Sequence, residues 1–405
     1  MKKTIVIFIG GYLPGKKYGG PVTSIENFIN QLHEWFNIKV ICNDHDFKET
    51  ERYKEIQNGW NRVGYADVFY TNEKKYSSGQ FCKIIKDFAD NIAMFYLSGI
   101  YYIKMNYAAI KLGRMLNIPV VLAPRGDLMK NTISMKSKRK MMKKIVFLAI
   151  CRYSKLFRGV YFQSTSDEET RGIRHYLDIN DSVIYQLPNL PVIKHERINY
   201  KKEKNSLKIV FISRLMVKKN PKLALEAVKE ISEKYNVVFD LYGPKEDHEY
   251  WSVCNKLINE TNTTKRNVLV SYKGPLDPVA AKHIYDEYDC FLFPTFSENY
   301  GHVIVESLFS GCPVVISKGT TPFDDCHEKA GFTVRLDSQR DFTRYLEKIA
   351  DMDELQYAKL CESIDDYVAE KFQIDKLRQD YLKMIATISG ERDEGSISNN
   401  CADSI

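Results

Sequence analysis

Short apolar runs alternate with longer amphipathic segments along most of this chain. Between the first two runs, residues 20–34 carry apolar side chains at helical spacing, through Ile25, Phe28, Ile29 and Leu32. The order of strand, helix and strand predicts parallel sheets built from βαβ units. In the first half, the runs expected to form strands are residues 4–9, 38–42, 93–98, 119–123 and 159–163.

The same alternation starts again in the second half, which predicts a second domain of the same kind. Strands are expected at residues 207–213, 237–242, 268–273 and 290–294, and helices at 221–235 and near 279–288. Residues 187–192 hold two prolines, which favour an extended backbone and mark a boundary. We therefore expect an α/β protein with two Rossmann-like domains, residues 1–188 and 189–364.

The C-terminal part of the chain divides into two segments. Residues 365–389 are patterned as a helix, which we expect to pack back toward the N-terminal domain. Residues 390–405 have little apolar surface to bury, so we expect a disordered tail.

Length and composition indicate two cores and no membrane span. At 405 residues the chain exceeds the ~100–200 residues of one ordinary domain, and 44% of its residues are hydrophobic. No segment reaches the ~18 uncharged apolar residues that a spanning helix needs, and the first apolar run is too short for a signal peptide. Nine scattered cysteines without a Cys-x-x-Cys pair indicate a reducing cytoplasm, with neither a disulfide framework nor a zinc site.

Charge is divided unequally between the two halves. Residues 1–190 hold 29 Lys and Arg against 17 Asp and Glu, a net +12, whereas residues 191–405 hold 30 against 35, a net −5. The stretch from Lys130 to Arg158 has ten basic residues and no acidic one, with apolar side chains at helical spacing. Two interpretations stay open: a basic helix whose apolar side packs on the core, or a contact with an anionic membrane surface or a polyprenyl phosphate. Nucleic acid is not expected, because the stretch has few aromatic side chains for stacking and the chain has no recognised binding module.

Candidate chemistry lies in residues 293–315, where Glu298 and Glu306 are eight residues apart. If a helix begins near Asn299, Glu306 lies two turns inside it, roughly 10–12 Å from the preceding strand at ~1.5 Å per residue. Gly301 lets a phosphate approach backbone N–H groups at the positive end of the helix dipole. We therefore expect a diphosphate between the two glutamates.

A diphosphate site also needs cations, because negative charge grows on the leaving group as a glycosidic bond breaks. Arg214 and Lys219 follow the first strand of the second domain, where open α/β sheets bind ligands. We assign this role to these two residues and leave out the neighbouring Lys218.

These residues resemble glycosyltransferase family 4, within the glycosyl transferases group 1. The strongest motif is Ser-Arg-Leu followed by Lys-Lys-Asn in residues 213–220, together with two glutamates separated by seven residues. Nearly all of residues 207–335 follow the family's pattern. Further matching segments are residues 241–244, 272–276 and 311–315, and weaker ones are residues 18–21, 123–127 and 163–167.

The resemblance implies the GT-B fold, two Rossmann-like domains facing a central cleft, and transfer that retains anomeric configuration. It implies that Arg214 and Lys219 hold the diphosphate, that Glu298 contacts the hydroxyls of the donor sugar, and that Glu306 bonds the ribose. Arg214, Lys219 and Glu298 would be the catalytic residues. No metal or other cofactor is expected, and no dedicated protein base, since the leaving phosphate assists deprotonation of the acceptor. The donor site implied in full is Gly19, Gly20, Arg214, Lys219, Gly243, Leu276, Glu298, Asn299, Tyr300, Gly301, His302 and Glu306.

One position departs from the family's pattern. Many relatives have His-Gly where this chain has Arg125-Gly126. We expect Arg125, Gly126 and Asp127 to lie in the acceptor part of the cleft, where Arg125 and Asp127 orient acceptor or donor.

Several of these positions also have simpler interpretations. Gly19 and Gly20 alone would be a tight turn, and two glutamates alone would be solvated helix carboxylates. His302 either contacts the donor or caps the helix start. Asp44-His-Asp46 resembles the Asp-x-Asp of metal-dependent glycosyltransferases, but it follows the second strand of the N-terminal half, so we interpret the pair as solvated loop acids.

The expected activity is transfer of a hexose or N-acetylhexosamine from a nucleoside diphosphate, UDP more than GDP, to a glycan or polyprenyl-diphosphate-linked oligosaccharide. The expected place is the cytoplasmic face of the cell membrane, as a peripheral protein of polysaccharide, lipopolysaccharide or O-antigen biosynthesis. Two alternatives remain: a nucleotide-sugar epimerase of the same architecture, and a catalytically silent subunit that binds nucleotide sugars.

Overall fold

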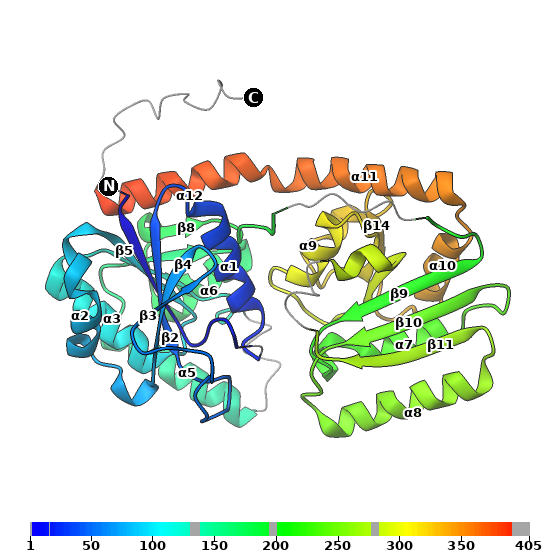
Figure 1. Cartoon of the computed structure of the whole chain (residues 1–405), viewed down its shortest axis with the longest axis horizontal. Coiled ribbons are helices and arrows are strands. Elements are labelled where there is room, and N and C mark those ends of the chain that lie inside the picture. Colours follow the sequence, from blue (N-terminus) through cyan, green and yellow to red (C-terminus); the bar gives the residue numbers. More distant parts are fainter. Residues whose placement is uncertain (1, 16, 130–137, 194–200, 277–282, 391–405) are drawn as a thin grey trace. The chain divides into compact units, whose positions relative to one another are not determined.

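The computed structural model describes residues 2–15, 17–129, 138–193, 201–276 and 283–390. They form two compact units with a sheet each (Figure 1). Unit 1 comprises Met1–Leu190 and Asp375–Ile405, and unit 2 comprises Pro191–Ile374.

Unit 1 is built on an eight-stranded sheet in the order β3-β4-β2-β1-β5-β6-β7-β8. Neighbouring strands run parallel except β3, which pairs with β4 in the antiparallel sense. The chain order reverses between β1 and β5, and such switch points are where open α/β sheets bind ligands. The strands are β1 Thr4–Ile9, β2 Asn37–Asn43, β3 Trp60–Val63, β4 Ala66–Thr71, β5 Ile92–Ser98, β6 Val120–Ala123, β7 Val160–Ser164 and β8 Ile184–Gln186.

Helices cover both faces of this sheet, which explains why β1 is apolar at every position after Thr4. Successive side chains of a strand point to opposite faces. Ile5 and Ile7 pack with α1 (Gly20–Leu32) and α12 (Ile374–Ser389), whereas Val6 and Phe8 face the other layer. That layer comprises α2 Ser78–Ile85, α3 Ile103–Leu116, α5 Lys138–Tyr153 and α6 Asp167–Leu177.

Unit 2 has a six-stranded, wholly parallel sheet in the order β11-β10-β9-β12-β13-β14. Counted from its first strand this is the Rossmann order 3-2-1-4-5-6, with the switch point between β9 and β12. The predicted α/β class with two Rossmann-like parallel sheets is therefore confirmed. The strands are β9 Ser206–Ile212, β10 Asn236–Tyr242, β11 Val268–Gly274, β12 Cys290–Phe293, β13 Val314–Ser317 and β14 Gly331–Val334. The helices are α7 Pro221–Lys229, α8 His248–Thr264, α9 His302–Phe309, α10 Gln339–Ala350 and α11 Glu354–Phe372.

The C-terminal region differs from the single helix expected over residues 365–389. It holds α11 and α12, separated by Gln373 in the left-handed conformation with φ of 40°. Phe372 packs on Phe309 in unit 2, at 5.0 Å between ring centroids, whereas Tyr381 lies in the core of unit 1. A break is needed because the chain passes from one core to the other within a few residues. Unit 2 consequently extends to Ile374 instead of 364, and residues 391–405 lie outside the described residues.

Helix α5 carries apolar side chains on two sides. Leu148 and Cys151 are buried against the sheet, but a second row faces solvent, ending at Tyr153, which is 84% exposed. Of the two interpretations, packing of the apolar stripe on the core therefore holds for only part of the stripe. Residues 130–137, the start of the basic stretch, lie outside the described residues. The exposed row comprises Met142, Ile145, Val146, Ile150 and Tyr153. Among the described helices, none is both long enough and apolar enough to cross a bilayer.

Candidate active site

The candidate site of unit 2 forms where two loops leave the carboxyl ends of β9 and β12, on either side of the switch point. The loop after β12 is fixed to the loop after β9 through the carbonyl of Lys218. That oxygen accepts hydrogen bonds from the Phe296 N–H at 2.9 Å and from the Thr295 hydroxyl at 3.2 Å. The side chains that follow are therefore carried on two loops held together by backbone groups.

Lys219 and Glu298 form an ion pair across this switch point. The Lys219 ammonium donates to Glu298 Oε1, and the two side chains are only 12% and 13% exposed. The same ammonium lies 5.5 Å from the centroid of the Phe293 ring. Two of the predicted catalytic residues, distant in sequence, are thus adjacent in space and nearly removed from water.

Arg214 has a different partner, which the sequence did not predict. Its Nη1 donates to both carboxylate oxygens of Glu246, at 3.1 and 3.3 Å, and the Arg214 side chain is 47% exposed. Glu246 lies after β10, in a segment without a charge pattern that marks it as functional. The pair holds the guanidinium at the carboxyl edge of the sheet while leaving it accessible.

Gly243 is required for this arrangement of loops. It has φ of 134°, and a Cβ placed on it would lie 1.8 Å from the carbonyl oxygen of Ser213. The close approach lets Leu215 donate its N–H to the Pro244 carbonyl at 2.9 Å. The described contacts of Gly243 thus join the loop after β10 to the loop bearing Arg214.

Helix α9 begins at His302, three residues later than expected. Glu306 therefore lies about one turn from the helix start, roughly 6 Å along the axis, and the expectation of two turns was wrong. The left-handed Gly301, with φ of 73°, ends the preceding loop and starts the helix. No side chain caps α9, so the dipole at its start is not offset by a capping group.

Tyr300 and His302 gather with Glu306 at this helix start. The rings of Tyr300 and His302 are 4.7 Å apart. Tyr300 is buried, and its hydroxyl has no hydrogen-bond partner among the described residues. Burial raises the pKa of Tyr300, and the nearby Glu306 carboxylate raises it further, so the phenol stays protonated. Asn299 is half-buried beside them, and Leu276 is half-buried against the core of unit 2.

The candidate residues of unit 1 occupy the carboxyl edge of its own sheet. Gly19, with φ of 67°, precedes α1, and the space that a Cβ would fill is open. Gly20 is the first residue of α1 and is followed by a proline, which suits the first turn of a helix. Gly19 thus ends the loop after β1 and Gly20 begins α1, at the switch point of unit 1.

Arg125 follows β6 and bonds within unit 1. Its guanidinium donates to the Tyr96 hydroxyl at 2.8 Å and to the side-chain oxygen of Asn189. Burial raises the pKa of Tyr96, an effect that the positive charge of Arg125 partly opposes. The described contacts make Arg125 a link between β5 and the segment just before the unit boundary at Leu190.

The neighbours of Arg125 are also held inside unit 1. Gly126 donates its N–H to the buried carboxylate of Glu169, which also accepts from the Thr165 N–H at 2.8 Å. Asp127 Oδ1 lies 4.0 Å from the Lys144 ammonium. Glu169 was missed by sequence reasoning because three acidic residues begin α6 and nothing in the pattern distinguishes the buried one.

The interpretation of Asp44 and Asp46 as solvated loop acids was wrong for Asp46. Asp46 is buried, and its Oδ1 accepts the N–H of Lys17 at 3.1 Å and of Phe47 at 2.8 Å. It therefore fixes the loop after β1 to the loop after β2. In the part of the chain that the structure describes, no three His, Cys, Asp or Glu side chains are grouped to hold a metal ion.

Comparison with solved structures gives the class of fold. The chain has the GT-B fold: Anabaena Alr3699/HepE, in complex with UDP and glucose, aligns over 95% of this chain and 100% of that one, with 13% identity and a TM-score of 0.66. TarM aligns over 95% and 99%, with 11% identity and a TM-score of 0.67. The lipopolysaccharide outer core galactosyltransferase WaaB aligns over 96% and 99%, with 13% identity and a TM-score of 0.59.

A comparison with models of protein families finds a match within unit 2. Residues 192–369 match the family described as Glycosyl transferases group 1. The match spans β9 to β14 and includes Arg214, Lys219, Glu298 and Glu306. No curated protein sequence matches the chain.

Proposed function

We propose that this protein is a retaining glycosyltransferase of family 4, which moves a hexose or N-acetylhexosamine from a nucleoside diphosphate to a lipid-linked oligosaccharide. The observation that carries the proposal is the nearly buried Lys219–Glu298 pair at the switch point of a 3-2-1-4-5-6 sheet. Open sheets of this kind bind nucleotides at that place.

In the proposed site the diphosphate replaces Glu298 as the partner of Lys219. Arg214, accessible beside Glu246, supplies the second cation, and the start of α9 supplies backbone N–H groups. Glu298, released from the ammonium, accepts hydrogen bonds from the hydroxyls of the donor sugar. Glu306 bonds the ribose.

The chemical step follows from the same placement. As the glycosidic bond lengthens, negative charge accumulates on the departing phosphate, next to Lys219 and Arg214. A leaving phosphate oxygen takes the proton of the attacking hydroxyl, so no protein base takes part. The cations also supply the charge for which other glycosyltransferases use a divalent metal, and we propose that no cofactor takes part.

UDP is the proposed nucleotide. The structures of Anabaena Alr3699/HepE contain UDP or UDP-glucose, and a S. aureus TarM structure contains UDP with alpha-GlcNAc-glycerol. The likeness to WaaB favours a role in lipopolysaccharide or related polysaccharide assembly.

The proposed place of action is the inner face of the cell membrane. The exposed row on α5 has the spacing of one helix side, and it is flanked by Arg139 and Lys143 on one edge and Arg152 on the other. Apolar side chains bordered by cations are the composition of helices that lie in the interface of anionic bilayers. Such a helix would bring the candidate acceptor residues near a lipid-linked substrate.

A panel of nucleotide sugars tests the proposal. Binding to the folded state raises thermal stability, so the true donor raises the Tm of the protein most. We expect Lys219→Ala to abolish that rise and to lower transfer by ~10²-fold or more, as removal of a transition-state cation does. Lys218→Ala, the matched control one residue away, keeps both.

Two other results would contradict the proposal. Near-normal transfer by Lys219→Ala would contradict the assignment of Lys219 to the active site. Free epimerised sugar formed from donor alone, without any acceptor, would identify an epimerase.

A further inference from the structure

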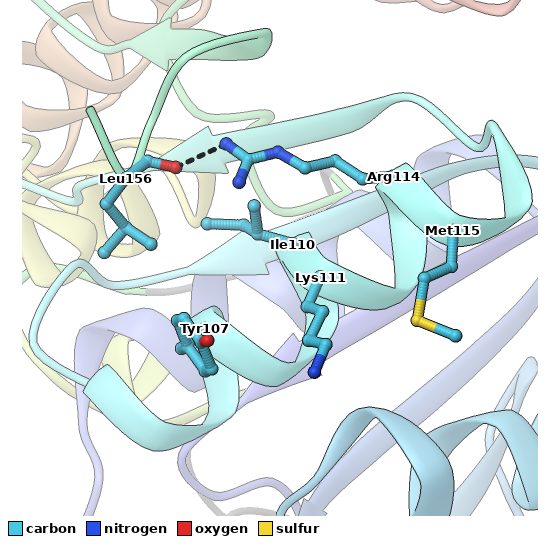
Figure 2. A pocket seen from close by; sticks show the side chains of 6 residues that line it. All are labelled: Tyr107, Ile110, Lys111, Arg114, Met115 and Leu156. Carbon is cyan, nitrogen blue, oxygen red and sulfur yellow. Dashed lines mark hydrogen bonds between the residues drawn. The ribbon is translucent and has the colours of Figure 1, made fainter. Parts of the chain in front are cut away.

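A pocket of 320 Å³ opens on the outer side of α3, and its lining includes none of the candidate site residues. Figure 2 shows Tyr107, Lys111 and Met115 along one side of this helix, with Ile110 and Arg114 directed toward Leu156. These six residues form the lining, and none of them is acidic.

The pocket has an apolar floor and, on one side, a positively charged guanidinium that hydrogen bonds hold in place. Ile110 is buried and belongs to the core of unit 1, whereas Tyr107 and Met115 are 55% and 63% exposed at the rim. The Arg114 Nη2 donates to the carbonyls of Leu156 at 2.7 Å and Arg158 at 2.8 Å. These two bonds hold the guanidinium charge in place beside the apolar surface.

The pocket and the exposed row of α5 face the same way. Both α3 and α5 bury their inner sides on one face of the sheet, through Ala109 and Leu112 of α3 and Leu148 and Cys151 of α5. Their outer sides therefore point away from that same face. Leu156 follows the end of α5 by three residues, so the pocket lies at the C-terminal end of the exposed row.

This end of α5 is remote from the candidate acceptor residues. In a parallel sheet the connecting helices run opposite to the strands, so the ends of α3 and α5 lie at the amino edge. Gly19 and Arg125 lie on loops after β1 and β6, at the carboxyl edge. The 16 residues of α5 span about 24 Å between the two edges.

The charged residues in this part of the chain are almost all basic. Residues 103–158 contain 14 Lys and Arg and a single acidic residue, Asp127. Lys111 and Arg114 are exposed at the pocket, and Tyr153 is the last residue of α5. An occupant that fits must present an anion to the cations and an apolar chain to the floor.

We propose that the pocket binds one molecule of an anionic phospholipid, with its phosphate at Lys111 and Arg114 and the start of an acyl chain along Ile110, Met115 and Leu156. The inference rests on the membrane part of the proposed function and adds a defined lipid site to it. With the lipid at its C-terminal end, α5 lies flat on the bilayer. The candidate acceptor edge is then held at a fixed distance from the membrane surface.

The test uses the full chain and dihexanoylphosphatidylglycerol below its critical micelle concentration, so that no bilayer is present. We expect a saturable rise in Tm for the wild type. Lys111→Gln combined with Met115→Ser should weaken this binding at least about tenfold, since one cation near an anionic headgroup contributes about fivefold by itself. The matched control is Lys104→Gln, which removes the same charge from the same helix outside the pocket and should bind as the wild type does.

Three results would overturn the proposal: no saturable rise in Tm, an equal rise with inorganic phosphate or dihexanoylphosphatidylcholine, or equal loss in Lys104→Gln. The changed residues are exposed, so the variants should fold, which circular dichroism checks. No sugar nucleotide is present, so failure of the donor panel leaves this result unaffected. Flotation of Met142→Ser/Ile150→Ser with phosphatidylglycerol vesicles reports on α5 alone and separates the membrane proposal from the pocket.

Discussion

Replacement of Glu298 by Gln should separate donor binding from turnover. In the free protein the Lys219 ammonium is paired with Glu298, and both side chains are nearly buried. Breaking a buried pair from one side typically destabilises a protein by about 3–5 kcal/mol, because one charge is left without a partner. We therefore expect Glu298→Gln to lower the free energy of unfolding of unit 2 by about 3 kcal/mol.

The UDP diphosphate offers the unpaired ammonium a new anion. If the complex recovers even about 1.4 kcal/mol of the lost pairing, the Kd of UDP falls tenfold. Transfer should meanwhile fall by ~10²-fold or more, because the sugar hydroxyls lose their carboxylate. The variant is thus expected to bind UDP more tightly and to turn over far more slowly.

Titration calorimetry measures the UDP affinity, and sugar transfer to acceptor measures the turnover. The unfolding of unit 2 can be followed alone by tryptophan fluorescence, since Trp251 is its only tryptophan. Trp35→Phe and Trp60→Phe remove the two tryptophans of unit 1. Glu306→Gln is the matched control: the same chemical change should weaken UDP binding, because the proposed function has Glu306 bond the ribose. If Glu298→Gln weakens UDP binding as Glu306→Gln does, Lys219 does not exchange its carboxylate for phosphate, and the reasoning fails.

Three further predictions concern stability and are checked by urea unfolding followed from Trp251 or by calorimetry. Gly243→Ala should destabilise unit 2 by roughly 2–4 kcal/mol, because the added Cβ overlaps the Ser213 carbonyl. Gly19→Ala strains the backbone but places its Cβ in open space, so it should lower the free energy of unfolding by only about 1–2 kcal/mol. Equal losses of stability in the two variants would contradict the argument from close approach. Tyr300→Phe removes a buried hydroxyl that has no partner among the described residues, so it should stabilise the free protein by about 1 kcal/mol, and a clear loss of stability would mean that the hydroxyl is bonded. Burial alone would raise the pKa of Asp325, but hydrogen bonds from Lys371 and Tyr367 outweigh it and lower the pKa. The ionised carboxylate therefore stabilises the fold above the unfolded pKa of about 3.9, and this stabilisation is lost as pH falls through the folded value. Asp325→Asn should consequently make the free energy of unfolding less dependent on pH in the acid range.

Elements with a strong local signal were predictable from the sequence. Strand β1 has the predicted bounds because five consecutive apolar residues, Ile5 to Ile9, favour a strand that is buried on both faces. Unit 2 follows its motifs, so the sequence alone predicts Lys219 and Glu298 as site residues, and the structure pairs them. Strands β3 and β4 were missed because their polar and apolar residues mix at the edge of the sheet.

Features that depend on contacts between distant segments were not predictable. Glu246 has no motif, and only the fold brings it to Arg214. The start of α9 was misplaced because Gly301 takes a left-handed conformation that a sequence pattern does not reveal. On α5 nearly every position is apolar or basic, so its periodicity does not tell which apolar row meets the sheet.

The return of α12 to unit 1 has a consequence for biosynthesis. Tyr381 donates to the Pro188 carbonyl at 2.9 Å, and its ring lies 5.9 Å from that of Phe28, so one face of the first sheet is completed by a helix that is translated only after all of unit 2. At about 5–20 residues per second, the ribosome needs roughly 10–40 s to pass from Leu190 to Tyr381. During that interval the nascent chain carries an open apolar surface while unit 2 folds, which is when a chaperone would be needed most.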